Sequence, residues 1–242
     1  MTDECFLDYT VDKDACVVFI YTWRRKEILE QCVDSMIKNP GYPMRLWVVD
    51  NGNCDGSREY LLSKVYEGHI EKLIIEKRNW GIWYPLNECR ALLHVTSIQP
   101  YIPKPKYFFL SNDDMIVKVD NWLKILVDSF EELKNCPYKI GILSPFHCKR
   151  LDGNYADSMT PEDYWNGYPI STYVSGNTWF VDTDLFLSMP DFPVDNSIEM
   201  GDWFMLDEYK KRGYKCVRTK EEILYHHPDT QQFGKYNYLR HW

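Results

Sequence analysis

The sequence places an amide and two carboxylates directly after a run of apolar residues. Residues 107–110 are apolar or aromatic throughout, which is typical of a strand buried on both faces of a parallel sheet. Asn112, Asp113 and Asp114 follow. Adjacent carboxylates at the end of a strand form an anionic site suited to Mg²⁺ or Mn²⁺, and such a cation can bridge to a diphosphate. Because Asn and Asp also favour turns, this stretch alone is equally consistent with a plain strand end.

The elements that must position these residues alternate along the first half of the chain. The hydrophobic pattern predicts strands at residues 17–21, 46–49, 73–75 and 107–110, and helices at residues 28–37, 57–65 and 85–95. Strands that alternate with helices require right-handed parallel crossovers. The predicted fold class is therefore α/β, a single Rossmann-like domain whose central, mostly parallel sheet is flanked by helices.

After Asp114 the regular alternation of strands and helices ends. The pattern predicts a helix at residues 121–133, strands at 140–143 and 172–181, a long loop or hairpin at 147–170, a helix at 203–212, and short strands at 214–217 and 223–225. No repeat or linker interrupts the chain, so residues 1–242 are expected to form one domain. A boundary near residue 115 would divide it into halves at about 16–115 and 116–242.

The composition excludes several classes of protein. With 242 residues, 45% hydrophobic and 16% aromatic, the chain is long enough to bury a sizeable core. A net charge of −8 argues against broad binding to nucleic acid or anionic membranes. The eight cysteines show no Cys-x-x-Cys pair, and the start does not look like a signal peptide, so we expect reduced thiols and a cytoplasmic location. No run approaches the roughly 18 apolar residues of a membrane span.

Four stretches match one known set of motifs. They are Tyr21-Thr22-Trp23-Arg24-Arg25, Val49-Asp50-Asn51-Gly52-Asn53-Cys54-Asp55-Gly56-Ser57, Asn79-Trp80-Gly81 followed by Asn87, and Asn112 to Val117 followed by Asn121-Trp122-Leu123. Together they resemble the family 2 glycosyltransferases of GT-A fold, most closely the rhamnosyltransferase-like branch. The second stretch is similar to the family's Val-Asp-Asn-Gly-Ser-x-Asp-Gly-Ser at nearly every position. The resemblance covers about residues 16 to 228.

The second half follows the family pattern less tightly. Ser175-Gly176-Asn177 and Phe180 stand where the family has a Gly-Gly and a strand on the acceptor side. Asp202 stands where the family keeps the Asp of a Glu-Asp pair that opens a helix, and Lys211-Arg212-Gly213-Tyr214 is similar to the end of that helix. Gly201 departs from the pattern because Glu is usual there.

The resemblance implies a role for each matching residue. Thr22, Arg24, Asp50 and Asn79 would bind the nucleoside of the donor, with Asp50 accepting a hydrogen bond from a uracil or thymine N–H, although an Asp before Asn-Gly also forms turns. Asn87, Asn112 and Asp113 would also bind the donor. Asp114, Asp113 and a late histidine, His226 or His227, would hold Mn²⁺ or Mg²⁺ as a Lewis acid for the leaving diphosphate. A tandem His after a strand is otherwise an ordinary surface pair.

The acceptor hydroxyl needs a general base within hydrogen-bond reach. By family position this is Asp202, with Glu199 as the second choice. The helix dipole also favours an Asp in the first turn of a helix without any catalytic role. Four aromatic residues could stack on a sugar or simply pack in the fold: Tyr164, Trp165, Tyr168 and Trp179.

The sequence thus predicts a metal-dependent, inverting glycosyltransferase. Its partners would be a UDP-, dTDP- or GDP-linked sugar and a saccharide or glycoconjugate acceptor, with no nucleic acid and no membrane span. A sugar-phosphate nucleotidyltransferase is disfavoured because no Gly-rich phosphate loop bearing Arg or Lys follows the first predicted strand. A non-catalytic nucleotide- or carbohydrate-binding module of the same fold is the remaining alternative, and Gly201 is its only indication.

Overall fold

The computed structural model describes residues 14–98, 103–145, 160–174, 178–193 and 201–227. Its first half alternates strands and helices, as the hydrophobic pattern predicts. The elements are β1 (Cys16–Thr22), α1 (Lys26–Ile37), β2 (Met44–Asp50), α2 (Ser57–Tyr66), β3 (Ile70–Ile75), α3 (Trp83–Ile98) and β4 (Tyr107–Asn112). None of the described helices combines the length and apolar character that a membrane span requires.

The second half contains shorter elements. They are β5 (Met115–Val117), α4 (Trp122–Leu133), β6 (Ile140–Ser144), β7 (Asp163–Trp165), β8 (Tyr168–Ser171), β9 (Thr178–Asp182), α5 (Thr183–Ser188), α6 (Gly201–Lys211), β10 (Lys215–Arg218) and β11 (Leu224–His226). The hairpin expected within residues 147–170 is formed by β7 and β8. The strand expected at 172–181 is shorter, because residues 172–174 are not in a strand and 175–177 lie outside the described residues.

One large sheet organises the described residues. Its nine strands lie in the order β3-β2-β1-β4-β9-β6-β10-β8-β7, and β11 and β5 form a separate two-stranded sheet. Strands β3, β2, β1 and β4 are parallel, whereas β9 is antiparallel to both of its neighbours, β4 and β6. The sheet is therefore mixed. Its parallel block consists of β3, β2, β1 and β4, which come from the first half of the chain, as the sequence pattern predicts.

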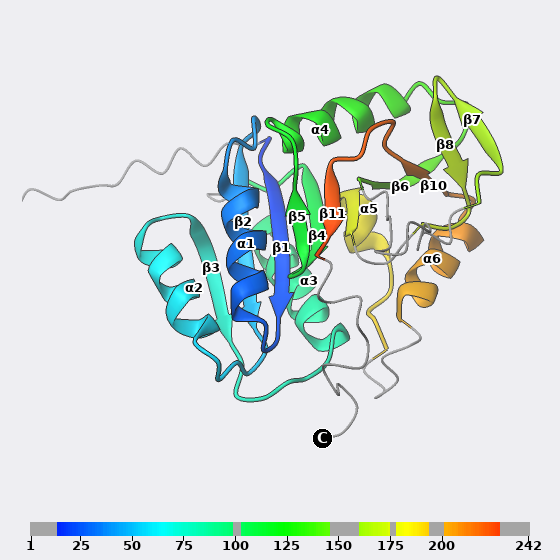
Figure 1. The fold of residues 1–242 in the computed structure, drawn as a ribbon. Coiled ribbons are helices and arrows are strands. Elements are labelled where there is room, and N and C mark those ends of the chain that lie inside the picture. The colour runs from blue at the N-terminus through cyan, green and yellow to red at the C-terminus, as the bar shows by residue number, and fades with distance from the viewer. Residues whose placement is uncertain (1–13, 99–102, 146–159, 175–177, 194–200, 228–242) are drawn as a thin grey trace, which may run out of the picture.

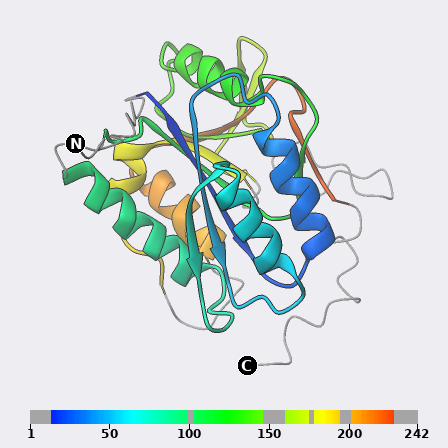
Figure 2. The ribbon, with the colours of Figure 1, turned by 90° about the vertical axis from the view of Figure 1, so that its left-hand side faces the viewer.

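Helices cover both faces of this sheet (Figures 1 and 2). On one face α1, α2 and α4 pack against β-strand side chains such as Val18 and Phe109. On the other face α3, α5 and α6 pack against the alternate side chains, such as Phe19 and Phe108. Because consecutive residues of a strand point to opposite faces, the uninterrupted apolar runs of β1 and β4 supply both cores at once.

The register of the parallel block places four strand ends at one edge of the sheet. Thr22 at the end of β1 pairs with Asp50 at the end of β2, and Asp50 pairs with Ile75 at the end of β3. Tyr21 pairs with Asn112 at the end of β4. The polar segments that follow these strands therefore start side by side, at the edge where open α/β sheets bind ligands.

Candidate functional site

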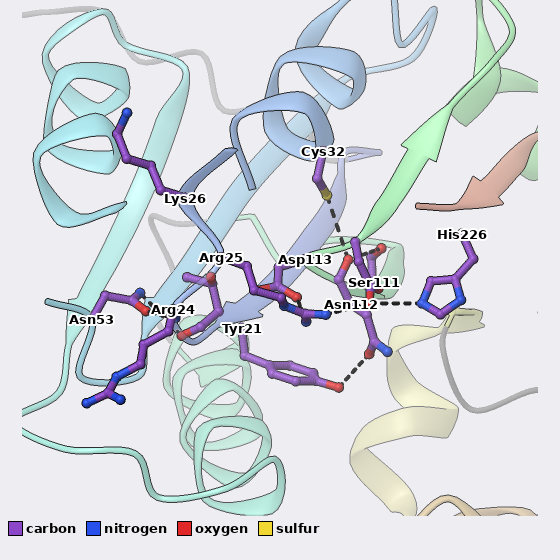
Figure 3. Close-up of polar contacts among 12 residues, drawn as sticks. Tyr21, Arg24, Arg25, Lys26, Cys32, Asn53, Ser111, Asn112, Asp113 and His226 are labelled. Carbon is purple, nitrogen blue, oxygen red and sulfur yellow. Dashed lines mark hydrogen bonds and ion pairs between the residues drawn. The ribbon is translucent and has the colours of Figure 1, made fainter. Parts of the chain in front are cut away.

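The site is centred on Asp113 and Asp114, which follow β4. Their exposed fractions are 0% and 3%. The guanidinium of Arg25 bridges them, because Nη1 donates to Asp114 Oδ2 at 2.7 Å and Nη2 donates to Asp113 Oδ1. Figure 3 shows Arg25 reaching across to Asp113 from the segment after β1. Two buried carboxylates thus share one arginine, which compensates part of their charge.

His226 joins the same group from the other half of the chain. Its Nε2 lies 2.9 Å from Asp114 Oδ2, because the antiparallel pairing of β11 with β5 sets His226 opposite Met115, the residue after Asp114. The backbone N–H of His227 donates to the carbonyl of Asp114 at 2.8 Å. Of the two histidines left open by the sequence, His226 contacts the acidic pair through its ring.

The two carboxyl groups differ in pKa. Burial raises the pKa of Asp113 above its usual value, and this outweighs the nearby charge of Arg25. Burial acts in the same direction on Asp114, but the hydrogen bond from His226 and the charge of Arg25 dominate and hold the pKa of Asp114 well below its usual range. Asp114 is therefore the stronger acid of the pair.

The described side chains of this site are of types that ligate a divalent cation, although they do not lie close enough together to hold one. Carboxylate oxygens and an imidazole nitrogen are ligands that Mn²⁺ accepts. Asp113 Oδ2 and Asp114 Oδ1 are buried and accept no hydrogen bond of normal geometry from the described residues, so two oxygens remain available. Within the part of the chain that the structure describes, however, no group of three His, Cys, Asp or Glu side chains lies close enough together to hold a metal ion.

Asp50 lies at the end of β2, which β1 separates from β4 in the sheet, and is fully buried. Its Oδ1 accepts a hydrogen bond from the backbone N–H of Asn53 at 2.7 Å, and its Oδ2 accepts one from Arg58 Nε at 2.6 Å. Asp50 therefore shapes the turn after β2 and pairs with a cation. Carboxylate oxygens have further lone pairs, so these bonds leave acceptor capacity for a ligand.

The segments after β2 and β3 are held together by amide side chains. Asn51 Nδ2 donates to Asn79 Oδ1 at 2.7 Å and to the carbonyl of Gly81 at 2.8 Å. Gly52 adopts a φ of +83°, and a Cβ atom there would lie 2.6 Å from the backbone of Arg78. The Asn-Gly of this motif is thus required by a close approach of two backbones. Asn79, predicted to bind the nucleoside, is placed at this junction.

Two residues of the first motif point in different directions. Arg24 has a positive φ of 54°, its backbone N–H donates to Asn53 Oδ1, and its guanidinium lies over the ring of Trp23. Figure 3 shows it directed away from Asp113. Arg25 is the arginine that contacts the acidic pair, and the sequence analysis assigned it no role. The available signal was its place in the Tyr21-Thr22-Trp23-Arg24-Arg25 stretch, one of the four that carry the family resemblance.

Asn112 and Asn87 lie in different surroundings. Asn112 Oδ1 accepts a hydrogen bond from the hydroxyl of Tyr21, next to the acidic pair (Figure 3). Asn87 lies on α3, where its amide donates to the carbonyl of Phe192 at 2.9 Å and accepts from the N–H of Phe192 at 2.9 Å. These two bonds give Asn87 a structural contact that its motif did not predict. The donor-binding role expected of Asn87 stays a prediction.

The acceptor-side residues are described only in part. Asp202 lies in the first turn of α6, which begins at Gly201. Glu199 and the Ser175-Gly176-Asn177 stretch lie outside the described residues. Of the four aromatic candidates, Trp179 on β9 is buried in the core that α3, α5 and α6 cover, and Tyr164 on β7 is 65% exposed. Trp165 and Tyr168 stack on each other with ring centroids 6.3 Å apart.

Comparisons with solved structures agree with this architecture. The mannosyltransferase PcManGT from Pyrobaculum calidifontis, in complex with GDP-Man and Mn²⁺, aligns with a TM-score of 0.59 and 15% identity over 87% of this chain and 56% of its own. S. aureus TarS 1–349 in complex with UDP gives 0.63 and 13% over 87% and 60%. GalNAc-T7 with UDP, GalNAc and Mn²⁺ gives 0.64 and 14% over 88% and 43%. The chain thus spans less than two thirds of each of these structures.

Comparison with protein families gives a direct match. Curated protein sequences include no significant match to the chain. The family model described as glycosyl transferase family 2 matches residues 17–180, which is more than half of the 242 residues. That range begins in β1 and ends in β9, so it includes all four strand ends of the parallel block and the acidic pair. The chain belongs to glycosyl transferase family 2 and has a GT-A fold.

Proposed function

We propose that this protein transfers a sugar from a nucleoside diphosphate donor to a hydroxyl of an acceptor glycan or glycoconjugate, with a divalent cation at Asp114 and with inversion at the sugar carbon. The observation that carries the proposal is the buried pair Asp113 and Asp114 at the carboxyl end of β4, in contact with Arg25 and His226. Buried carboxylates at this edge of a sheet are suited to a cation-bridged diphosphate.

The donor would lie along the ends of the parallel strands. The register of β1 and β2 sets Thr22 and Asp50 at that edge, and Asn79 accepts a hydrogen bond from Asn51, the residue after Asp50. The solved structures of PcManGT with GDP-Man and of TarS with UDP support a nucleotide-linked donor of the UDP, dTDP or GDP type. We assign residues 16–115 to donor binding and residues 116–242 to acceptor binding. His226 belongs to the second range, but its ring contacts Asp114 in the first.

The cation would be held by Asp114, Asp113 and His226. When bound, Mn²⁺ or Mg²⁺ supplies a Lewis acid that stabilises negative charge on the leaving diphosphate. The buried oxygens Asp113 Oδ2 and Asp114 Oδ1 support this assignment, because neither accepts a hydrogen bond of normal geometry within the part of the chain that the structure describes. The PcManGT and GalNAc-T7 structures, which contain Mn²⁺, support the same choice of ion.

The acceptor would react in a single displacement. Asp202 takes the proton of the acceptor hydroxyl as the new bond forms between that oxygen and the anomeric carbon of the donor sugar. The bond between the anomeric carbon and the diphosphate oxygen breaks, and its electron pair leaves with the nucleoside diphosphate. Attack from the side opposite the leaving group inverts the anomeric configuration. The position of Asp202 in the first turn of α6 supports this role.

A donor screen followed by a hydrolysis assay tests the proposal. With Mn²⁺ present, one class of UDP-, dTDP- or GDP-sugar should raise the melting temperature, because a ligand of the native state stabilises it. The same donor should then be hydrolysed slowly without an acceptor, releasing a nucleoside diphosphate and a free sugar. Binding without any hydrolysis or transfer would favour a non-catalytic module, and a retained anomeric configuration would contradict single displacement.

A substitution at Asp50 tests the nucleoside contact. Asp50→Ala should weaken binding of the accepted nucleoside diphosphate by about 1–3 kcal/mol, the usual cost of leaving a polar partner unsatisfied. Arg58→Gln is the matched control, because it removes the ion pair to Asp50 Oδ2 and leaves the carboxylate in place. Calorimetry should show a smaller loss for Arg58→Gln. Equal losses in the two variants, or no loss in Asp50→Ala, would make Asp50 a residue that only shapes the turn.

A further inference from the structure

Arg25 occupies the acidic pair as a bound cation would. Its guanidinium donates to one oxygen of Asp113 and one of Asp114, and its side chain is only 14% exposed. Asp114 Oδ2 receives both Arg25 Nη1 at 2.7 Å and His226 Nε2 at 2.9 Å. Figure 3 shows Arg25 and His226 approaching from opposite sides. Asp113, Asp114 and His226, the three groups that would ligate a metal, are thus engaged with each other or with Arg25.

A divalent cation cannot join this arrangement unchanged. Ligation by Asp114 and His226 requires the Nε2 of His226 to turn from Asp114 Oδ2 to the metal. The cation would also stand within a few ångströms of the guanidinium, where two positive charges in a buried site repel each other strongly. In the described residues these side chains accordingly do not form a three-ligand cluster, although the ligand types are present. Arg25 must therefore withdraw before the metal binds.

The backbone around Arg25 restricts this movement to the side chain. The carbonyl of Arg25 accepts hydrogen bonds from the N–H groups of Ile28 at 3.1 Å and Leu29 at 2.8 Å, which begin α1. Its Cα is therefore fixed at the carboxyl edge of the sheet, beside the end of β1. A diphosphate on this edge would offer an anion to the displaced guanidinium, which binds phosphate oxygens in bidentate fashion.

We propose that Arg25 is an exchangeable internal cation: it occupies Asp113 and Asp114 while the donor is absent, and it moves to the diphosphate when the donor and a divalent cation bind. This inference rests on the metal and diphosphate assignments of the proposed function. It adds a coupling between the two ligands. The metal removes Arg25 from the carboxylates, the diphosphate receives it, and by linkage each ligand raises the affinity for the other.

The test measures Mn²⁺ binding to the full chain without any nucleotide. Free Mn²⁺ is followed by electron paramagnetic resonance for the wild type, Arg25→Gln and Lys26→Gln. Lys26→Gln removes the same charge one residue away, where the side chain pairs with Glu30 on the surface. Arg25→Gln should bind Mn²⁺ at least about tenfold more tightly than the wild type, within the usual range of coupling between sites. Lys26→Gln should match the wild type, and Arg25→Gln combined with Asp114→Asn should lose the gain.

A second arm adds UDP. UDP should raise the Mn²⁺ affinity of the wild type by a larger factor than that of Arg25→Gln, and because UDP chelates Mn²⁺ equally in both, the difference reports Arg25. If Arg25→Gln melts below the assay temperature without metal, Arg25→Lys takes its place and should show a smaller gain, because one ammonium group bridges two carboxylates less well.

The outcomes separate this inference from the proposed function. An unchanged or weaker Mn²⁺ affinity in the Arg25 variants overturns the exchange, even if the wild type hydrolyses a nucleotide sugar. A gain in Mn²⁺ affinity that is absent from Lys26→Gln supports the exchange, even if no nucleotide sugar is turned over, in which case the proposed function fails alone.

Discussion

Asp114→Asn should lower the rate of sugar transfer by about 10³-fold or more while the protein remains folded. The substitution keeps the volume of the side chain and removes the charge that would bind the cation, so the Lewis-acid stabilisation of the leaving diphosphate, worth several kcal/mol, is lost. The fold should persist because Asp113 still pairs with Arg25. Initial rates with Mn²⁺ measure the loss of transfer. Calorimetry with UDP measures the affinity: its Mn²⁺-dependent share should vanish, and its Mn²⁺-independent share should stay.

Asp128→Asn is the control for this variant, because Asp128 is an exposed carboxylate on α4 that pairs with Lys124. Its transfer rate should equal that of the wild type. Undiminished Mn²⁺-dependent transfer by Asp114→Asn would remove Asp114 from the metal site.

Asp202→Asn should lower the transfer rate by about 10²-fold or more, the usual scale for a positioned general base. The base acts on the acceptor hydroxyl in the transition state, so the loss should appear in kcat, whereas donor affinity with Mn²⁺ should hardly change. Asn keeps the size of Asp and gives up only the interaction of its charge with the helix dipole, so stability should fall little. Transfer kinetics, together with UDP calorimetry on the same protein, measure both quantities.

Glu208→Gln serves as the matched control on the same helix, where Glu208 pairs with Lys211. A wild-type rate in Asp202→Asn would move the base elsewhere, and Glu199 would be tested next. Equal losses in Asp202→Asn and Glu208→Gln would point to a general disturbance of α6 and not to proton transfer.

The parallel block could be predicted from the sequence because its signals are local. Val17 to Tyr21 and Tyr107 to Leu110 are apolar at every position, which is the pattern of strands that supply a core on each face. The polar motifs follow these strands directly, so the register of the sheet was enough to bring Thr22, Asp50 and Asn112 to one edge.

Elements that depend on distant partners were not predicted. Strand β5 has three residues and exists because β11, more than a hundred positions later, pairs with it. Helix α5 has six residues, and its clearest local signal was Asp182, whose Oδ1 accepts from the N–H groups of Asp184 and Leu185 at 2.9 and 3.1 Å. The acidic pair was predicted from residue types, whereas its contact with Arg25 depends on the direction of a side chain, which no spacing encodes.

The placement of β9 has a consequence for how the chain is made. Phe109 in β4 pairs with Val18 on one side and with Phe180 on the other. A nascent chain that has emerged only as far as β4 therefore carries a bare, hydrophobic strand edge, which is prone to pair with other chains. The contact between His226 and Asp114 forms later still, because β11 follows β9 in the chain. Synthesis must thus reach β9 (Thr178–Asp182) before the edge is covered, which makes the first half a poor candidate for expression as a separate fragment.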